Sequence, residues 1–141
     1  MRYLAIDYGD KRTGLAVCDA AEILASPLEV LGTNSQLTDA IVRVVAEYEV
    51  QCIVLGLPLN MDGSEGDRAG AVRAFAKKLG KVTELAIIFH DERLSSFDAQ
   101  QKMAEMDLSR KGRKKRVDAL AAAAILESFL EHKHQGDVTN E

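Results

Sequence analysis

Tryptophan is absent from this chain, and proline, cysteine and aromatic residues are scarce. The 141 residues include two prolines and two cysteines, and Phe, Trp and Tyr together make up 5%. Cys18 and Cys52 lie far apart, without the spacing of a metal site or a redox motif. This scarcity argues against a disulfide scaffold or a zinc module, and we expect both thiols to be reduced residues of the core.

No hydrophobic run is long enough to cross a membrane. The longest, CIVLGLPL and LAIIF, fall far short of the roughly 20 residues that a membrane-spanning helix needs. The first residues, MRYLAIDYG, enter a predicted strand at once and do not resemble a signal peptide. We therefore expect a cytoplasmic protein that makes no membrane contact.

Charge is low overall but unevenly distributed. The formal net charge is −4, which argues against a protein that coats nucleic acid through bulk charge. Residues 110–116, RKGRKKR, nevertheless hold six of the 18 lysines and arginines. Because salt screens distant charges, such a local cluster can bind phosphates on an acidic protein. The ordinary alternative is a solvated loop.

Hydrophobic periodicity predicts three strands followed by alternating helices and strands. The predicted strands cover 2–7, 15–19, 29–32, 52–58 and 85–92, the last two buried on both faces. The predicted helices cover 37–48, 69–79 (opened by a Ser64–Asp67 capping pair), 95–106 and 116–131, with a polar basic loop at 107–115.

This order of elements predicts an α/β fold. The first three strands form an antiparallel meander, and the later βα units extend it into a mixed sheet with helices on both faces. The length suits a single domain, which we assign to residues 1–133. Residues 134–141 have no apolar periodicity and are expected to be a flexible tail.

Acidic residues stand at the ends of these predicted elements. Asp7 ends the first strand, Asp91 and Glu92 end the last strand, and Asp118 opens the final helix. In open α/β sheets ligands gather at the carboxyl ends of parallel strands, so we expect these acids to converge there. Converging carboxylates serve either as an acid/base pair or as a site for Mg²⁺ or Mn²⁺.

The alternative interpretation needs no site. Asp7 would simply begin a turn, and Asp118 would complement the dipole of its helix. Asp91 and Glu92 would pair with Arg93, the next residue along the chain.

A glycine-containing turn follows Asp7. The stretch YGDKRTG places Gly9 and Gly14 in a predicted hairpin that carries Lys11 and Arg12. Such a hairpin can cradle a phosphate or can be an ordinary turn. Neither it nor GLPLNMDGSEG matches a dinucleotide-binding or P-loop pattern, so neither kind of site is supported.

Four segments resemble, in order, the signature blocks of one known family. They are AIDYGDKRTGLAVCD, VLGLPLNMDGSEG, HDERLSS and KKRVDALAAAAILESFL. The family is YqgF/RuvX, whose small members are assigned as pre-ribosomal-RNA nucleases or as Holliday junction resolvases. The resemblance covers residues 2–131 and implies a ribonuclease H-like fold, a five-stranded mixed sheet flanked by helices.

The resemblance also implies an activity, metal-dependent phosphodiester hydrolysis with Mg²⁺ or Mn²⁺ as cofactor. Matched by position, the catalytic and metal-binding residues are Asp7, Glu92 and Asp118, with Asp91 as the alternative to Glu92. Many related nucleases carry an acid at the end of the fourth strand, where this chain has Gly56-Leu57-Pro58. The second ligand must then come from the fifth strand, and we favour Glu92 for its longer reach.

The implied role is processing of the 5′ end of precursor 16S ribosomal RNA, with resolution of four-way DNA junctions as the alternative. We expect nucleic acid as partner, precursor rRNA rather than junction DNA, possible contact with ribosomal particles, and a monomer or weak homodimer. The residues expected to bind phosphates are Lys11, Arg12, Arg93, Arg110, Lys111, Arg113, Lys114, Lys115 and Arg116.

Two other functions stay open. The turn DYGxxxxG is similar to the first phosphate loop of sugar kinases and heat-shock ATPases, which would make the chain a nucleotide-binding phosphotransferase. Alternatively, the chain is a non-catalytic RNA-binding module that keeps its acids as a relic.

Overall fold

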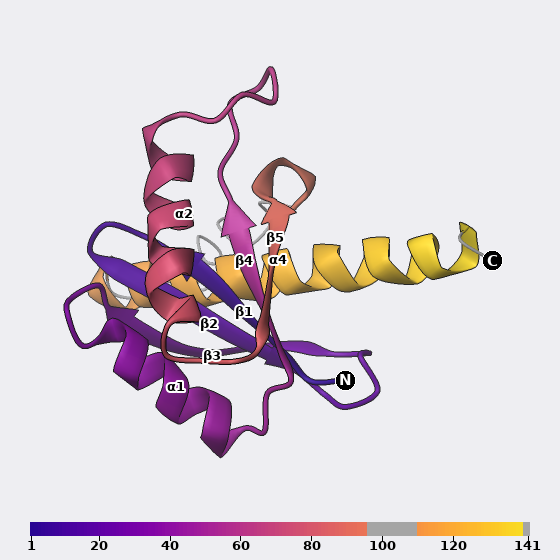
Figure 1. Cartoon of the computed structure of the whole chain (residues 1–141), viewed down its shortest axis with the longest axis horizontal. Helices are drawn as coiled ribbons and strands as arrows, with labels where there is room; N and C mark the ends of the chain where they lie inside the picture. The colour runs from indigo at the N-terminus through magenta and orange to yellow at the C-terminus, as the bar shows by residue number, and fades with distance from the viewer. Residues whose placement is uncertain (96–109, 140–141) are drawn as a thin grey trace.

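Five strands form one mixed sheet that has helices on both faces (Figure 1). The structure, a computed structural model, describes residues 1–95 and 110–139, with side chains over 1–95 and 119–135. Its elements are β1 (Tyr3–Tyr8), β2 (Arg12–Cys18), β3 (Ala25–Gly32), α1 (Leu37–Glu47), β4 (Cys52–Leu57), α2 (Asp67–Gly80), β5 (Ala86–Asp91), the 3₁₀ turn η1 (Glu92–Leu94) and α4 (Arg110–Thr139). Within these residues no helix has both the length and the apolar character needed to span a membrane.

The sheet has the strand order β3-β2-β1-β4-β5. β2 pairs antiparallel with β1 and β3, whereas β4 pairs parallel with β1 and β5. The predicted α/β class, the antiparallel meander and the mixed five-stranded sheet are therefore confirmed. As a consequence, β1, β4 and β5 all end at the same edge.

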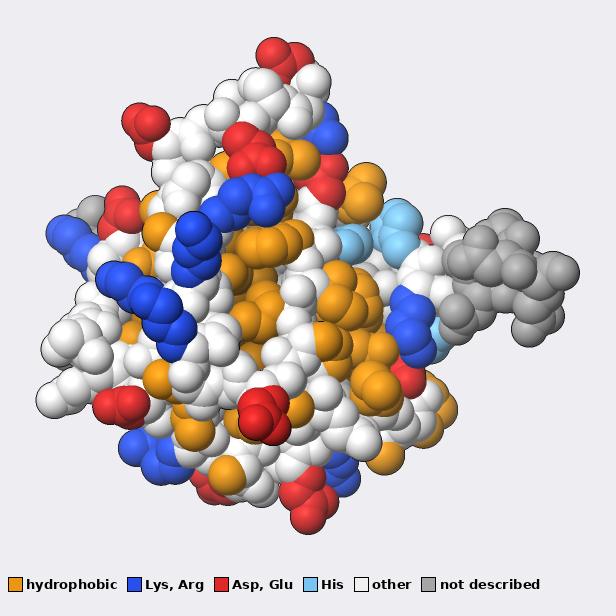
Figure 2. All heavy atoms as spheres, viewed as in Figure 1, with side chains coloured by type: hydrophobic (Ala, Val, Ile, Leu, Met, Phe, Trp, Pro, Cys, Tyr) orange, Lys and Arg blue, Asp and Glu red, His pale blue; other side chains and the backbone are white. Residues whose placement is uncertain are grey.

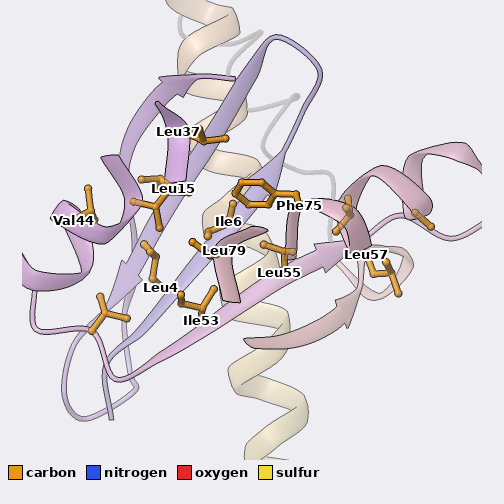
Figure 3. Close-up of a cluster of buried hydrophobic side chains, with 14 residues drawn as sticks. Leu4, Ile6, Leu15, Leu37, Val44, Ile53, Leu55, Leu57, Phe75 and Leu79 are labelled. Carbon is orange, nitrogen blue, oxygen red and sulfur yellow. The ribbon is translucent and has the colours of Figure 1, made fainter. Parts of the chain in front are cut away.

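Alternation along β1 builds a core on each side of the sheet. Leu4 and Ile6 point toward α1 and α2, where they meet side chains such as Phe75 (Figure 3). Tyr3 and Ala5 point toward α4 on the opposite face. Each large aliphatic side chain removed from water in this way stabilises the fold by about 1.5–3 kcal/mol.

Two of these elements follow the sequence pattern closely. All six residues of β4 are buried, as expected of an apolar strand covered on both faces. On α4 the small residues Ala122 and Ala123 are buried against the sheet together with Leu126 and Leu130. Small side chains bring this helix close to β1, β2 and β3, across which it lies. Cys18 and Cys52 are free thiols in the same core, as predicted.

The predicted hairpin after Asp7 is too long at its far end. β2 begins at Arg12, so Gly14 is not a turn residue but stands opposite Asp7 in the ladder. The side chain of Thr13 is fully buried and its hydroxyl lies 2.7 Å from that of Thr33 at the end of β3. This buried contact extends the ladder to Arg12.

The predicted Ser64–Asp67 capping pair is wrong. The N-cap of α2 is Gly66, and no side chain caps the helix. The Ser64 hydroxyl instead donates a 2.6 Å hydrogen bond to Asp62, two residues before it. Short polar side chains favour such local contacts, and here the local partner wins.

The prediction of a fifth strand buried on both faces is also wrong. β5 is an edge strand, and His90 is its one buried residue. Ile88 is exposed. In Figure 2, hydrophobic side chains gather on the surface over β5, beside the basic side chains of α2. An apolar run does not reveal whether a strand lies in the middle or at the edge of a sheet.

The last helix begins earlier than predicted. α4 starts at Arg110, so 110–115 are helical rather than a loop. Lysine and arginine have high helix propensity, which lets the basic stretch continue the helix. The predicted helix at 95–106 lies almost wholly outside the described residues. α4 continues to Thr139, and the flexibility expected of 134–141 stays a prediction.

Candidate active site

The carboxyl ends of β1, β4 and β5 bring several acidic positions to one edge of the sheet. The register pairs Ile6 with Leu55 and Leu57 with Asp91. Asp7 directly follows Ile6, and Glu92 directly follows Asp91 as the first residue of η1. This is the edge at which open α/β sheets bind their ligands.

The side chains of Asp7 and Glu92 meet across β4, the strand between them. Burial, the negative charge of Asp7 and a hydrogen bond to its carboxylate raise the pKa of Glu92 to about 7, while the charge of Arg68 opposes this rise. Each of these effects favours a proton on Glu92, which can donate that hydrogen bond to Asp7. Carboxyl groups that interact in this way titrate as a pair.

A glycine in β4 makes this meeting possible. A Cβ placed on Gly56 would stand 2.7 Å from Oε1 of Glu92 and 2.6 Å from Cδ1 of Ile125. Glycine inside a strand often marks the close approach of another group. The space over Gly56 is therefore occupied by the carboxyl group of Glu92, which reaches over from η1.

Asp91, the alternative candidate, has a different partner. Its carboxylate accepts bonds of 2.8 to 3.1 Å from Nε and Nη2 of Arg93. These bonds lower the pKa of Asp91. Asp91 also accepts a 2.9 Å bond from the backbone N–H of Arg93. The pair with Arg93 that the alternative interpretation expects is therefore present for Asp91, whereas Glu92 lies against Asp7.

Arg93 itself is occupied. Besides the pair with Asp91, its Nη1 donates to the backbone carbonyls of Met61 at 3.1 Å and Asn60 at 3.4 Å. These contacts tie η1 to the loop that follows β4. They give Arg93 a positioning role in addition to the phosphate contact predicted for it.

The other predicted cations of the described part lie on the hairpin that follows Asp7. Thr33 donates two hydrogen bonds to this turn, from its N–H to the Lys11 carbonyl at 3.0 Å and from its hydroxyl to the Gly9 carbonyl at 2.8 Å. A Cβ on Gly9 would stand 2.5 Å from the carbonyl oxygen of Arg12, so the tight turn requires glycine. Lys11 is exposed at the same edge of the sheet as Asp7.

The remaining predicted residues are on the first two turns of α4. Asp118 and the cations of 110–116 have a helical backbone, and their side chains lie outside the described part of the chain. Among the side chains that are described, no group of three His, Cys, Asp or Glu residues is close enough to hold a metal ion.

A buried polar chain links η1 to α4. His90 lies 2.8 Å through Nε2 from the Ser128 hydroxyl, which donates to the backbone carbonyl of Leu94 at 3.1 Å. Both side chains are buried. Because the Ser128 hydroxyl donates its proton to Leu94, His90 donates to Ser128 from Nε2–H. Burial also lowers the pKa of His90.

Comparison with known proteins supports a shared family. Residues 1–132 match the family model described as RuvX, Holliday junction resolvase. The chain belongs to the RuvX family. Curated relatives named "Putative pre-16S rRNA nuclease" include one from Anaeromyxobacter sp. (strain Fw109-5), 43% identical over 95% of this chain and 99% of its own. Another, from Rhodobacter capsulatus, is 46% identical over 89% of this chain and 80% of its own.

Solved structures share the fold of this RuvX family member. A Thermus thermophilus RuvC in complex with a Holliday junction substrate aligns with a TM-score of 0.55, at 14% identity over 95% of this chain and 96% of the other. A fowlpox virus resolvase bound to Holliday junction DNA aligns with a TM-score of 0.57, at 11% identity over 94% and 98%. The ribonuclease H-like fold implied by the sequence is therefore confirmed.

Three residues near the acids were missed in the sequence analysis. Only Gly56 could have been found, because a lone glycine inside an apolar strand suggests the close approach of another group. Arg68, which lies near enough for its charge to act on Glu92, is an ordinary exposed arginine in the first turn of α2. Ser128 carries no signal, since only the fold brings it to His90 and Leu94.

Proposed function

We propose that this RuvX family member is a metal-dependent nuclease that hydrolyses phosphodiester bonds at the Asp7–Glu92 edge. The observation that carries the proposal is the carboxyl pair itself. An acid from β1 and an acid from η1 meet over a glycine, where burial and the charge of Asp7 raise the pKa of Glu92 to about 7. A structural role rarely requires such a pair, whereas a site for a hard cation does.

The donor set fits Mg²⁺ or Mn²⁺. Carboxylate oxygens are the ligands that these cations prefer, and a cation would offset both the burial and the repulsion by Asp7 that raise the pKa of Glu92. A bound Mg²⁺ or Mn²⁺ supplies a more acidic water and stabilises charge on a leaving oxygen. Asp7 and Glu92 would hold it, and their proton would leave as it binds.

Asp118 is proposed as the third acid. It precedes Ile125 by seven residues, or two turns of α4, and residues at this spacing share a face of a helix. Ile125 contacts the position of Gly56, directly beside Glu92. The helix register therefore favours a position of Asp118 along the same edge.

Phosphate contacts are proposed for cations around this edge. Arg68 makes no hydrogen bond or ion pair within the described part of the chain, and its charge reaches Glu92. Lys11 and Arg12 lie on or beside the turn after Asp7, and the basic stretch 110–116 precedes Asp118 on α4. Such contacts supply affinity without reading sequence, so specificity has to come from the shape of the nucleic acid or from a partner.

Precursor 16S rRNA is the substrate we favour, because the curated relatives carry that activity in their names. The family description favours the second candidate, a four-way DNA junction. Both descriptions name hydrolysis of nucleic acid, so we favour it over phosphotransfer from a nucleotide. We further propose a cytoplasmic location, consistent with two free thiols, and action as a monomer or weak homodimer on free RNA or ribosomal particles.

A cleavage panel tests this proposal. Precursor 16S rRNA fragments, junction DNA and plain duplexes are incubated with Mg²⁺ or Mn²⁺ and with wild type, Asp7→Asn or Asp118→Asn. We expect cleavage by wild type alone, with precursor rRNA cut fastest. Equal cleavage by both variants would identify a contaminant or another site, and binding without any cleavage would favour the non-catalytic module.

A further inference from the structure

The loop after β4 is a preformed hairpin that projects from the body of the molecule (Figure 1). We call residues 59–65 the tip hairpin. It is closed by a bridge between Leu59 and Glu65 and by a 2.9 Å hydrogen bond from the Asn60 N–H to the Ser64 carbonyl. Its turn is formed by Gly63, whose φ of 88° suits glycine.

Side chains add further bonds inside the tip hairpin. The carboxylate of Asp62 accepts from both the N–H and the hydroxyl of Ser64, at 2.9 and 2.6 Å. The Asn60 amide donates to the same hydroxyl at 2.9 Å. A seven-residue loop with this many internal bonds keeps one conformation, so binding through it costs little ordering entropy.

Met61 stands at the end of the tip hairpin and is 97% exposed. Its backbone carbonyl accepts the 3.1 Å bond from Arg93, which also holds Asp91. Arg93 directly follows Glu92 in η1. The tip hairpin and the proposed catalytic acid are therefore fixed to one another through a single arginine.

We propose that Met61 packs against an unstacked nucleobase next to the phosphodiester that is cleaved at the Asp7–Glu92 edge. The inference rests on the proposed function and narrows its substrate class to nucleic acids with an unpaired or unstacked base near the cleaved bond. Methionine is among the apolar side chains that insert between base steps. Its flexible thioether adapts to flat, polarisable surfaces such as a base.

The charges of the tip hairpin favour a base over a phosphate as the group contacted. The hydrogen bonds from Ser64 lower the pKa of Asp62, so it stays negative and repels phosphates. Glu65 is paired with Arg73 through bonds of 2.6 and 2.7 Å, which neutralises that arginine locally. The uncharged part of a nucleotide is then the part that can approach Met61.

The test compares two substrates that differ only in base stacking. One is a continuous duplex, and the other is the same duplex with one unpaired base beside the cleaved bond. Cleavage efficiency, kcat/KM, is measured for wild type, Met61→Ala and Met61→Leu. The matched control is Ile23→Ala, because Ile23 is 82% exposed on the turn between β2 and β3, at the opposite edge of the sheet.

We expect wild type to prefer the unpaired substrate, and Met61→Ala to reduce that preference about tenfold, toward the lower end of the effect of removing an aromatic side chain that stacks on a base. Met61→Leu should retain most of it, and Ile23→Ala all of it. Binding is followed separately by the fluorescence of an unpaired 2-aminopurine in the Asp7→Asn background, where Met61→Ala should abolish the change on binding.

The outcomes separate this inference from the proposed function. Absence of metal-dependent cleavage by wild type on either substrate refutes the proposed function, and the inference with it. Cleavage with an unchanged substrate preference in Met61→Ala, together with an unchanged 2-aminopurine signal, overturns the inference alone. In that case the exposed methionine contacts something other than a nucleobase.

Discussion

The carboxyl group of Glu92 lies directly over Gly56, at 2.7 Å from the place where a Cβ would stand. This relationship lets an acid from η1 cross a strand and share a hydrogen bond with Asp7 on β1. The chain thereby obtains a carboxyl pair although β4 ends without an acid. The space over Gly56 is thus a requirement of the proposed site and can be tested directly.

Gly56→Ala should impair the site more than the fold. The new methyl group collides with Glu92 and with Ile125, so Glu92 must move away from Asp7. Overpacking of this kind typically costs about 1–3 kcal/mol of stability. We expect turnover to fall at least about tenfold, measured as metal-dependent cleavage of the preferred substrate, while thermal unfolding stays cooperative.

Gly70→Ala is the matched control for that substitution. Gly70 lies in the first turn of α2, and nothing stands within 4 Å of its added Cβ. Alanine is the better helix former, so stability should rise by about 0.5–1 kcal/mol with activity unchanged. Full activity of Gly56→Ala would mean that the position of Glu92 does not matter.

The affinity for Mg²⁺ or Mn²⁺ should depend on pH near neutrality. The pKa of Glu92 is raised to about 7, and its proton must leave before the carboxylate can bind a cation. Apparent affinity, measured by calorimetric titration of Mn²⁺, should therefore rise about tenfold per pH unit below pH 7 and level off above it. In Asp7→Asn, which lacks the neighbouring charge, the levelling should occur at lower pH.

Without metal, the stability of the protein should fall as pH rises, because the pKa of Glu92 is raised in the folded state. The folded-state pKa of Glu92 lies above its ordinary value of 4.5, so the folded state holds the proton more tightly than the unfolded chain. This contribution to stability is fully present below about pH 4.5 and is lost as pH rises through about 7. Urea denaturation in EDTA should detect the loss, and Glu92→Gln should remove it.

Ser128→Ala should loosen the turn that carries Glu92. The substitution leaves His90 without its acceptor and Leu94 without its donor, both on the site side of the sheet. Leaving a buried polar group unpaired costs about 1–3 kcal/mol. We expect kcat to fall with KM little changed, and Ser128→Thr, which keeps the hydroxyl, to recover part of the loss. Cys52→Ala, a buried change at the far end of β4, should lower stability but leave kcat unchanged.

Arg68 and Arg73 provide a matched pair on α2. Arg68 has no ion-pair partner in the part of the chain that the structure describes, whereas Arg73 is bonded to Glu65 and stacked over Phe89. If Arg68 neutralises one phosphate, Arg68→Ala should reduce the slope of log K against log salt by about 0.7–0.9. Arg73→Ala should leave the slope unchanged. Equal slopes for both variants would show that Arg68 does not contact a phosphate of the nucleic acid.

Much of the fold was predictable because its signals are local. The uniformly apolar β4, the amphipathic α1 and the position of Asp7 at a strand end can all be read from neighbouring residues. The extent of β5 burial could not be read, since an edge strand and a central strand share the same apolar run. The capping role predicted for Ser64 was wrong because its hydroxyl bonds to Asp62, two residues before it, instead of to the start of α2.

Of the proposed site, only the acidic residues could be inferred from the sequence. Asp91 and Glu92 are equivalent in the sequence, and what separates them is spatial, since Arg93 folds back on Asp91 while Glu92 crosses Gly56. The positioning role of Arg93 could not be predicted, because its contacts with the carbonyls of Asn60 and Met61 leave no trace in the sequence. Contacts between distant segments exist only once the chain has folded.

The most direct test of the account compares Glu92→Gln with Asp91→Asn. Both remove one charge from adjacent residues, but only Glu92 lies against Asp7. Rates of cleavage are measured with saturating Mg²⁺ or Mn²⁺ on the substrate that wild type cuts fastest. We predict that Glu92→Gln lowers the rate by a factor of at least about 100, while Asp91→Asn stays within about threefold of wild type. Wild-type cleavage by Glu92→Gln, or loss of cleavage in Asp91→Asn alone, would contradict the proposed site.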